Sequence, residues 1–217
     1  MIEDIVIVGA GGLGREIATV IENINRDDKR WNLIGYYDDD PSKSSIGEHP
    51  ILGNLEQLKK KQGQNVILAL GKPLLKKKII EFLKASNHSF PSIIHPGVIF
   101  GDRSTISLGM GNIITAGSIL TTDIQIANFC LINLNTTIGH DVNLESFVSI
   151  MPGANIAGSV KIYEGAFLGS GCNLINRTTI GRWSKIGAGS VVISNIPEGS
   201  TAVGVPAKVI KLADGFF

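Results

Sequence analysis

The sequence predicts two domains of different architecture: a small parallel α/β domain in residues 1–90 and a coil of short strands in residues 91–217. Charged residues occupy 25 of the first 90 positions but only 14 of the last 127, and such a shift in composition marks a domain boundary. An apolar run, a glycine-rich loop and an amphipathic segment follow one another near the N-terminus. In the second half, aliphatic residues recur every six positions. These two patterns require different folds.

Strands and helices alternate in the first domain. The apolar run 5–8 is typical of a strand, the loop 9–14 is glycine-rich, and residues 15–21 are apolar at helical spacing. Further elements are expected at 33–37 (strand), 65–70 (strand) and 76–85 (helix with a lysine-rich solvent face). The alternation predicts a parallel, Rossmann-like sheet about half the size of a full dinucleotide-binding fold.

The second half repeats with a period of six. Every sixth residue from Ile126 to Val192 is aliphatic, and the residue four positions after each of these is small or β-branched. A period of six fits neither a helix nor a lone alternating strand. It suits a chain that forms a short strand, turns a corner and starts again, so that three repeats complete one triangular coil. Glycine or asparagine at the corners accepts a positive φ.

This period, with the ending Val203-Gly204-Val205-Pro206-Ala207-Lys208, resembles that of the hexapeptide-repeat acyltransferases over residues 92–210. The resemblance implies a left-handed parallel β-helix whose coils stack at about 4.8 Å. The handedness comes from the resemblance, because crossovers between parallel strands are usually right-handed. The resemblance also implies a homotrimer with active sites between neighbouring β-helices.

Composition limits the partners and the compartment. The chain has 20 Lys and Arg against 19 Asp and Glu, a net charge of +1 that gives no bias toward nucleic acid or membrane. No apolar run approaches the roughly 18 residues of a membrane span, and the N-terminus has no signal pattern. Cys130 and Cys172 occupy the small-residue position of the repeat, which indicates packing and not redox chemistry. A cytoplasmic protein is expected.

One histidine stands out as a candidate base. His49, His88 and His95 are in loop or cap contexts, whereas His140 occupies the third position of a hexad and is expected to point off the coil. An imidazole titrates near neutral pH, so it can take a proton from an attacking amine or hydroxyl. The chain offers no nucleophile paired with a base, which favours direct transfer over a covalent intermediate.

The surroundings of His140 resemble those in bacterial sugar acetyltransferases of the sialic acid O-acetyltransferase type (NeuD/PglD-like). Members of this family carry a histidine followed by an acid, with an asparagine seven residues before it. The resemblance implies that His140, Asp141 and Asn133 are catalytic and that acetyl-CoA is the donor. The donor-binding positions that it implies are Ser149, Gly158, Ser170 and Ala188.

Alternatives stay open at several of these positions. Some relatives carry a second histidine where this chain has Ser149, and coil packing alone accounts for a residue such as Gly158 or Ala188. Lys208 and Lys211 are either ligands of the coenzyme A phosphates or solvated surface lysines. A γ-class carbonic anhydrase shares the β-helix but needs three histidines for zinc, and only His140 lies in the main repeat, so no metal is expected.

The glycine loop matches G-x-G-x-x-G between a strand and a helix, and acids follow the next strand. Alone, this pattern favours NAD, with phosphate at a helix N-terminus and carboxylate on ribose. Against NAD, the domain lacks a second mononucleotide half, no residue indicates hydride chemistry, and a β-helix follows. The family resemblance instead implies a nucleotide-sugar acceptor site. Its positions are Gly11, Gly12, Gly14, Asp38, Asp39 and Gly71, and Leu13 is apolar where relatives often have His or Lys.

The sequence therefore predicts a trimeric, acetyl-CoA-dependent N-acetyltransferase. The expected acceptor is the amino group of a nucleotide-linked 4-amino-4,6-dideoxy sugar, used in surface polysaccharide or glycan synthesis. One alternative is O-acetylation of sialic acid or another hydroxyl sugar. A second is a non-catalytic β-helix that serves as a binding or scaffold protein. The nucleobase and the sugar stereochemistry stay open.

Overall fold

The computed structural model describes residues 2–212, and the chain divides into two compact units at Pro96/Gly97. The predicted boundary at 90/91 lies slightly earlier. The difference arises at β6 (Ile93–Ile94), which contacts helix α1 of the first unit. His95 follows β6, and its Nε2 lies 3.1 Å from Nδ2 of Asn23 in the same helix.

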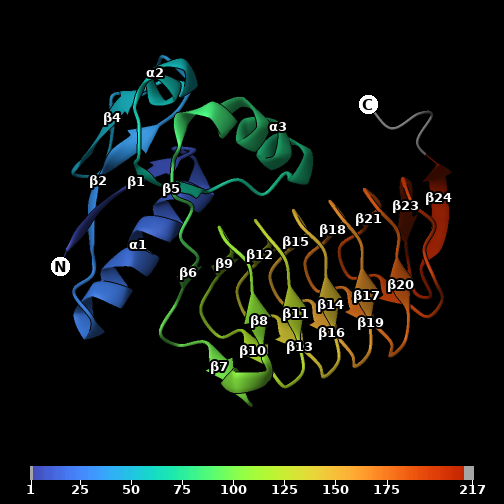
Figure 1. The fold of residues 1–217 in the computed structure, drawn as a ribbon. Helices are drawn as coiled ribbons and strands as arrows, with labels where there is room; N and C mark the ends of the chain where they lie inside the picture. The colour runs from blue at the N-terminus through green and yellow to red at the C-terminus, as the bar shows by residue number, and fades with distance from the viewer. Residues whose placement is uncertain (1, 213–217) are drawn as a thin grey trace. The chain divides into compact units, whose positions relative to one another are not determined.

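The first unit is built on a Rossmann-like sheet with the order β3-β4-β2-β1-β5 (Figure 1). All neighbours are parallel except the short hairpin of β3 with β4. The central strand β1 carries the continuous apolar run that a strand covered on both faces needs, and Ile5 to Val8 are buried. The strands are β1 (Glu3–Val8), β2 (Trp31–Tyr37), β3 (Ser45–Ile46), β4 (His49–Gly53) and β5 (Asn65–Leu68).

Helices α1, α2 and α3 accompany this sheet. Helix α1 (Gly12–Asp27) starts directly after the glycine loop and buries one apolar stripe that includes Ile17 and Ile21. Helix α2 (Leu55–Lys60) has a capping box formed by Asn54 and Gln57. Helix α3 (Pro73–Leu83) begins earlier than predicted because proline fits the first helical turn, and it continues into the 3₁₀ helix η1 (Lys84–Ser86).

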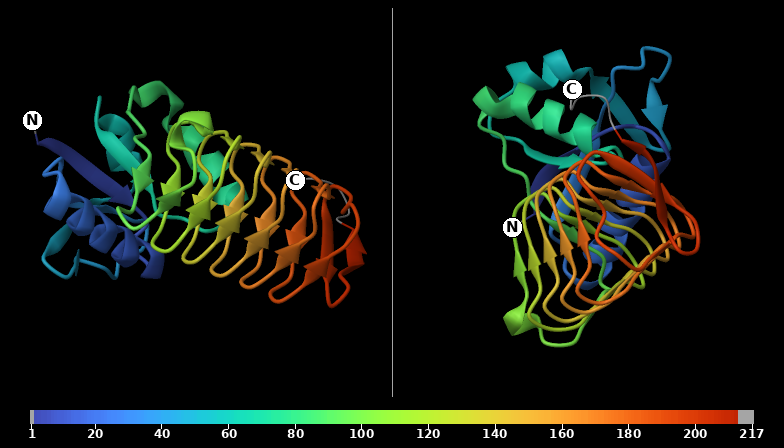
Figure 2. Two further views of the ribbon diagram at one scale, coloured as in Figure 1. Left: turned by 90° about the horizontal axis from the view of Figure 1, so that it is seen from below. Right: turned by 90° about the vertical axis from the view of Figure 1, so that its right-hand side faces the viewer.

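The second unit is a left-handed parallel β-helix, as predicted. Its coils stack along one axis, which the right-hand view of Figure 2 shows nearly end-on. Strands of successive coils pair in parallel at an offset of three hexads, as in Leu131, Ser149 and Phe167, so three hexads make one coil.

The strands form three faces. The first face contains β7 (Ile99–Phe100), β10 (Ile119–Leu120), β13 (Thr137–Ile138), β16 (Asn155–Ile156), β19 (Asn173–Leu174) and β22 (Val191–Val192). The second contains β8 (Ser107–Leu108), β11 (Gln125–Ile126), β14 (Asn143–Leu144), β17 (Lys161–Ile162) and β20 (Thr179–Ile180). The third contains β9 (Ile113–Ile114), β12 (Leu131–Ile132), β15 (Ser149–Ile150), β18 (Phe167–Leu168) and β21 (Lys185–Ile186). The 3₁₀ helix η2 (Arg103–Thr105) precedes β8.

The hexad pattern explains the interior of the coil. From β9 to β22, the second residue of each strand, such as Ile150 or Leu168, points inward and is buried. The small residues four positions later, such as Ala154 and Cys172, are also fully buried. Because each coil packs on the next, a larger side chain at these positions would overfill the interior.

The corners recur in columns of positive φ. The prediction of glycine or asparagine there holds at many corners, but aromatic and charged residues also adopt this conformation, at Phe129, Asp141, Phe147, Arg177 and Trp183. Contacts between coils offset the strain at the aromatic corners. The Phe129 and Phe147 rings stack, with 5.4 Å between their centroids and 9° between their planes. The Trp183 ring occupies the space where a Cβ atom of Gly165 would stand.

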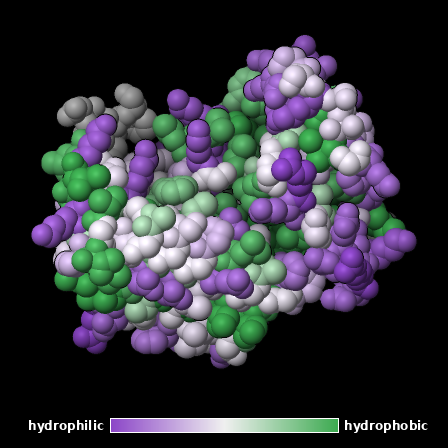
Figure 3. Space-filling view, turned by 180° about the vertical axis from the view of Figure 1, so that it is seen from behind, coloured by the Kyte–Doolittle hydropathy of each residue, from purple (hydrophilic) through white to green (hydrophobic). Residues whose placement is uncertain are grey.

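The β-helix ends in an antiparallel hairpin. Strand β23 (Ser200–Val203) continues the third face, and β24 (Lys208–Leu212) pairs with it. Val205, Ile210 and Leu212 are exposed there. Figure 3 shows apolar side chains in green over this end, beside paler and purple residues along the coils. No helix within residues 2–212 is long and apolar enough to cross a membrane.

Candidate functional site

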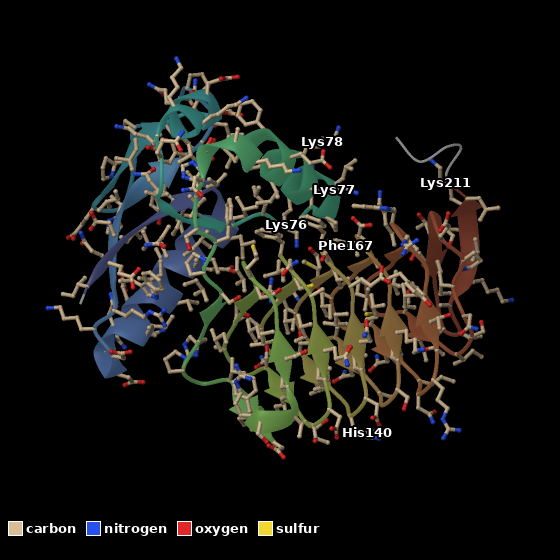
Figure 4. All side chains as sticks on the ribbon, viewed as in Figure 1. Lys76, Lys77, Lys78, His140, Phe167 and Lys211 are labelled. Atoms are coloured by element: carbon tan, nitrogen blue, oxygen red, sulfur yellow. The ribbon has the colours of Figure 1, made fainter. Side chains whose placement is uncertain are left out.

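The predicted base lies at the corner that follows β13. The side chain of His140 is 63% exposed and points away from the coil, as Figure 4 shows. Its Nδ1 lies 2.7 Å from Oδ2 of Asp141, which has a φ of 58°. An ionised carboxylate only accepts hydrogen bonds, so the pair favours the tautomer with the proton on Nδ1. Nε2 is then left with a free lone pair.

The next coil brings a glycine against the imidazole. Gly158 stands three hexads after His140 in the same column of corners, and the N–H of Ser159 donates to the carbonyl of His140 at 2.7 Å. A Cβ atom on Gly158 would lie 2.5 Å from both Cε1 and Nε2 of His140. The structure therefore brings together His140, Asp141 and Gly158.

Asn133 lies at a different corner of the coil, after β12. Its side chain is buried, and Oδ1 accepts from the N–H of Leu134 at 2.8 Å and from Oγ1 of Thr115 at 3.3 Å. Within one chain, the structure therefore separates Asn133 from the His140–Asp141 pair, because consecutive hexads place their ends on different edges of the prism.

An amide-lined groove lies beside the His140 corner. It has a volume of about 400 Å³ and crosses β13, β16 and β19. Thr137 Oγ1 donates to Asn155 Oδ1 at 2.8 Å, and Asn155 Nδ2 donates to Asn173 Oδ1 at 3.0 Å. The rest of the lining is Ile156, Ala157, Leu174, Ile175 and Asn176. These residues were not predicted, although the polar side chains at positions 137, 155 and 173 follow one another at intervals of three hexads.

The other predicted donor residues lie elsewhere on the coil. Ser149 is in β15 on the third face, and its buried hydroxyl has no hydrogen-bond partner among the described residues. Ser170 and Ala188 are exposed and occupy one column of corners, at the end of that face. They therefore lie on a different edge of the prism from Gly158. Lys208 and Lys211 are exposed on β24.

In the first unit, the glycine loop is tied to the end of β2. The N–H of Ala10 donates to Oδ2 of Asp38 at 2.6 Å, and this carboxylate also accepts from the N–H of Asp40 and from Lys43 Nζ. Burial alone would raise the pKa of Asp38, but these hydrogen bonds together hold it below its ordinary value. The carboxylate of Asp38 therefore braces the loop.

Asp39 has a similar structural contact, because its Oδ1 accepts from the N–H of Leu55 at the start of α2 at 3.0 Å. It also lines a hollow of about 380 Å³ with Asn54, Glu56 and Phe82. Each of the two predicted acids thus accepts a backbone hydrogen bond from another segment, Asp38 from the glycine loop and Asp39 from the start of α2.

The loop glycines divide into two groups. A Cβ atom on Gly14 would collide with the carbonyl oxygen of Gly9, so Gly14 allows α1 to approach the loop. A Cβ atom on Gly11 would meet nothing within 4 Å. Gly11 caps α1 without a side-chain hydrogen bond, and Gly12 begins the helix, so this end keeps backbone N–H groups for an anion. Gly71 is half-buried between β5 and α3.

Neither the cysteines nor a metal cluster adds a second reactive centre within residues 2–212. Cys130 and Cys172 are buried, and burial raises the pKa of the Cys172 thiol to about 12. Within the same range, no group of three histidine, cysteine, aspartate or glutamate side chains is arranged to hold a metal ion.

Comparison with known proteins identifies the family. Residues 4–83 match the PglD N-terminal domain family. The acetyltransferase domain of PglB from Neisseria gonorrhoeae, in complex with acetyl coenzyme A, is 26% identical with a TM-score of 0.88, over 97% of this chain and 100% of that chain. A mutant of perosamine N-acetyltransferase from Caulobacter crescentus, in complex with CoA and GDP-perosamine, is 30% identical with a TM-score of 0.84. The match covers 97% of this chain and 98% of that chain. The chain belongs to the hexapeptide-repeat sugar acetyltransferases of the PglD/NeuD type.

Membership of this family confirms the predicted resemblance and the predicted fold class. It also agrees with the prediction of an acyltransferase. Curated serine acetyltransferases match shorter stretches. The protein from Haemophilus influenzae is 35% identical over 82 residues and the one from Bacillus licheniformis 30% identical over 125 residues. The matched stretches span 31% and 47% of the length of these two curated relatives.

Proposed function

We propose that this family member transfers the acetyl group of acetyl-CoA to the amino group of a nucleotide-linked 4-amino-4,6-dideoxy sugar in glycan synthesis. The observation that carries the proposal is the His140–Asp141 pair on the outside of the coil, next to the amide-lined groove. A relative that matches nearly the whole chain was solved with CoA and GDP-perosamine, which supports this donor and this class of acceptor. The cytoplasm supplies both substrates.

In the proposed reaction, the sugar amine attacks the thioester carbonyl of acetyl-CoA. Nε2 of His140 takes the proton from the attacking nitrogen, while Asp141 holds Nδ1–H and stabilises the imidazolium that forms. The C–N bond forms, the C–S bond breaks, and the departing CoA thiolate takes the proton from the His140 imidazolium, which returns the base to its neutral form. No covalent acyl-enzyme is required.

The amide-lined groove suits the acetyl donor, acetyl-CoA. Pantetheine is an extended chain with two amide groups, and Asn155, Asn173 and Asn176 supply both donors and acceptors along the groove. Gly158 and the pair Ser170 and Ala188 lie on different edges of one prism. A coenzyme that contacts both sets is therefore placed between two copies of the chain, as in the predicted homotrimer.

The acceptor is assigned to the loop of the first unit. The open backbone at Gly11 and Gly12 suits a diphosphate, and the hollow beside Asp39 is available to the nucleoside. Asp38 contributes to this acceptor site indirectly, because its carboxylate holds Ala10 and so fixes the position of the glycine loop.

The test combines an acceptor panel with a variant. The protein is incubated with acetyl-CoA and with UDP-, dTDP- and GDP-linked 4-amino-4,6-dideoxyhexoses, alongside their 4-hydroxy counterparts and free sialic acid. Thiol release and the mass of the product are measured. We expect acetylation of one amino sugar and a loss of about 10²- to 10⁴-fold in kcat for His140→Ala. His49→Ala is the matched control and is expected to keep its turnover.

Three outcomes contradict parts of this proposal. Acetylation only of hydroxyl acceptors replaces the N-acetyltransferase with an O-acetyltransferase. No thiol release with any acceptor favours a non-catalytic binding protein. Undiminished turnover by His140→Ala removes His140 as the base.

A further inference from the structure

The His140 imidazole has two close neighbours. Asp141 Oδ2 lies 2.7 Å from Nδ1. The ring also covers the place where a Cβ atom of residue 158 would stand, at 2.5 Å from Cε1 and Nε2 and 3.0 Å from Cδ2. Cβ contacts this short do not persist in proteins, so the ring and any side chain at residue 158 exclude each other.

The backbone conformation at residue 158 does not require a glycine. The glycines with a left-handed φ include Gly153, Gly165 and Gly171, and Gly158 is not among them. The nearest atoms to its missing Cβ all belong to the imidazole, whereas at Gly139 they belong to the backbone of the next coil. A small side chain at residue 158 therefore conflicts first with the position of one exposed ring, and not with the backbone of a coil.

We propose that Gly158 is a positioning residue for the base: the absence of its side chain keeps the His140 ring on Asp141, with Nε2 over the surface of the next coil. A methyl group here would clash with Cε1 and Nε2, so the ring would have to leave its position beside the carboxylate. This inference rests on the proposed role of His140. It adds to the donor-contact role predicted for Gly158 a steric role that acts through His140.

The test is a double-mutant cycle with a structural readout. We expect Gly158→Ala to fold, to bind acetyl-CoA with a KM within about threefold of the wild type, and to lose about 10- to 100-fold in kcat, because a displacement of about 1 Å has an effect of this size. In the His140→Ala background, Gly158→Ala is expected to cause no further loss. Ser159→Ala, at the same corner, is the matched control and leaves the space beneath the ring unchanged.

A crystal structure of Gly158→Ala gives a readout that needs no activity. We expect the ring to have left the 2.7 Å contact with Asp141. The inference is overturned if the ring keeps this contact, or if the losses from the two substitutions multiply, which would assign Gly158 to donor binding alone. Full turnover by His140→Ala would instead overturn the proposed base, and the crystal structure would still decide what sets the position of the ring.

Discussion

At the scale of single residues, the same chemical group has different roles according to its packing. Asp141 is exposed and bonded to a histidine, whereas the carboxylate of Asp38 is mostly buried and holds a loop through the Ala10 N–H. The family resemblance implied a ligand-binding role for Asp38. Its hydrogen bonds depend on the spatial distance between two segments that are far apart in the chain, and the sequence does not contain that distance.

The cysteines give a prediction at this scale. Both thiols should be unreactive toward a thiol reagent at pH 8 in the folded protein, because they are buried and the pKa of Cys172 is raised to about 12. After denaturation, two thiols per chain should react. The measurement is the absorbance of the released reagent with and without denaturant. Rapid labelling of either thiol in the folded state would show that the coil interior is accessible.

At the scale of elements, the hexad predicted the β-helix because the repeat length, the inward aliphatic and the small residue each follow from one coil geometry. The same pattern did not predict the row of hydrogen-bonded side chains in the amide-lined groove, Thr137, Asn155 and Asn173. These side chains become neighbours only when successive coils stack. In the first unit, the short elements β3, β4 and α2 were not predicted, because short segments carry little periodicity.

His88, which follows η1, gives a prediction about the pH dependence of stability. The N–H of Gln64 donates to Nδ1 of His88, and Nε2 is buried. Burial lowers the pKa of His88, and the Leu58 carbonyl offsets only part of this effect, so folding favours the neutral ring. The stability from this group is complete above about pH 6.5 and is lost as the pH falls through the lower pKa of the folded state.

His88→Asn keeps an acceptor near the position of Nδ1 and removes the titration. We expect wild-type stability to fall more steeply than that of His88→Asn between pH 7.5 and pH 5.5, measured as the urea midpoint of unfolding. Parallel pH profiles for the two proteins would show that His88 does not contribute to the acid sensitivity of the fold.

At the scale of the whole molecule, the proposed site is divided over more than one edge of the β-helix. Gly158 and His140 share one column of corners, after the first face, whereas Ser170, Ala188 and Asn133 lie at the corners after the third face. A single prism cannot fold these edges toward one another, because its parallel sheets hold them apart. Association of copies is the way to bring two edges to one coenzyme.

The prediction at this scale is a homotrimer. Light scattering should give a mass three times the 23.1 kDa of one chain, and calorimetry should give one acetyl-CoA bound per chain. A dilution that dissociates the trimer should abolish donor binding in the same concentration range. A monomer that binds acetyl-CoA with unchanged affinity would contradict a site shared between copies.

The sequence by itself determined the two architectures, the period of the coil, the glycine loop and the histidine beside an aspartate, because each of these is a local pattern with one dominant structural solution. Tertiary structure alone decided that Gly158 lies under His140, that Asn133 lies at another corner and that Asp38 braces the loop. These facts depend on the stacking of one coil on the next and on pairing between distant strands. Such contacts form only when the whole unit packs.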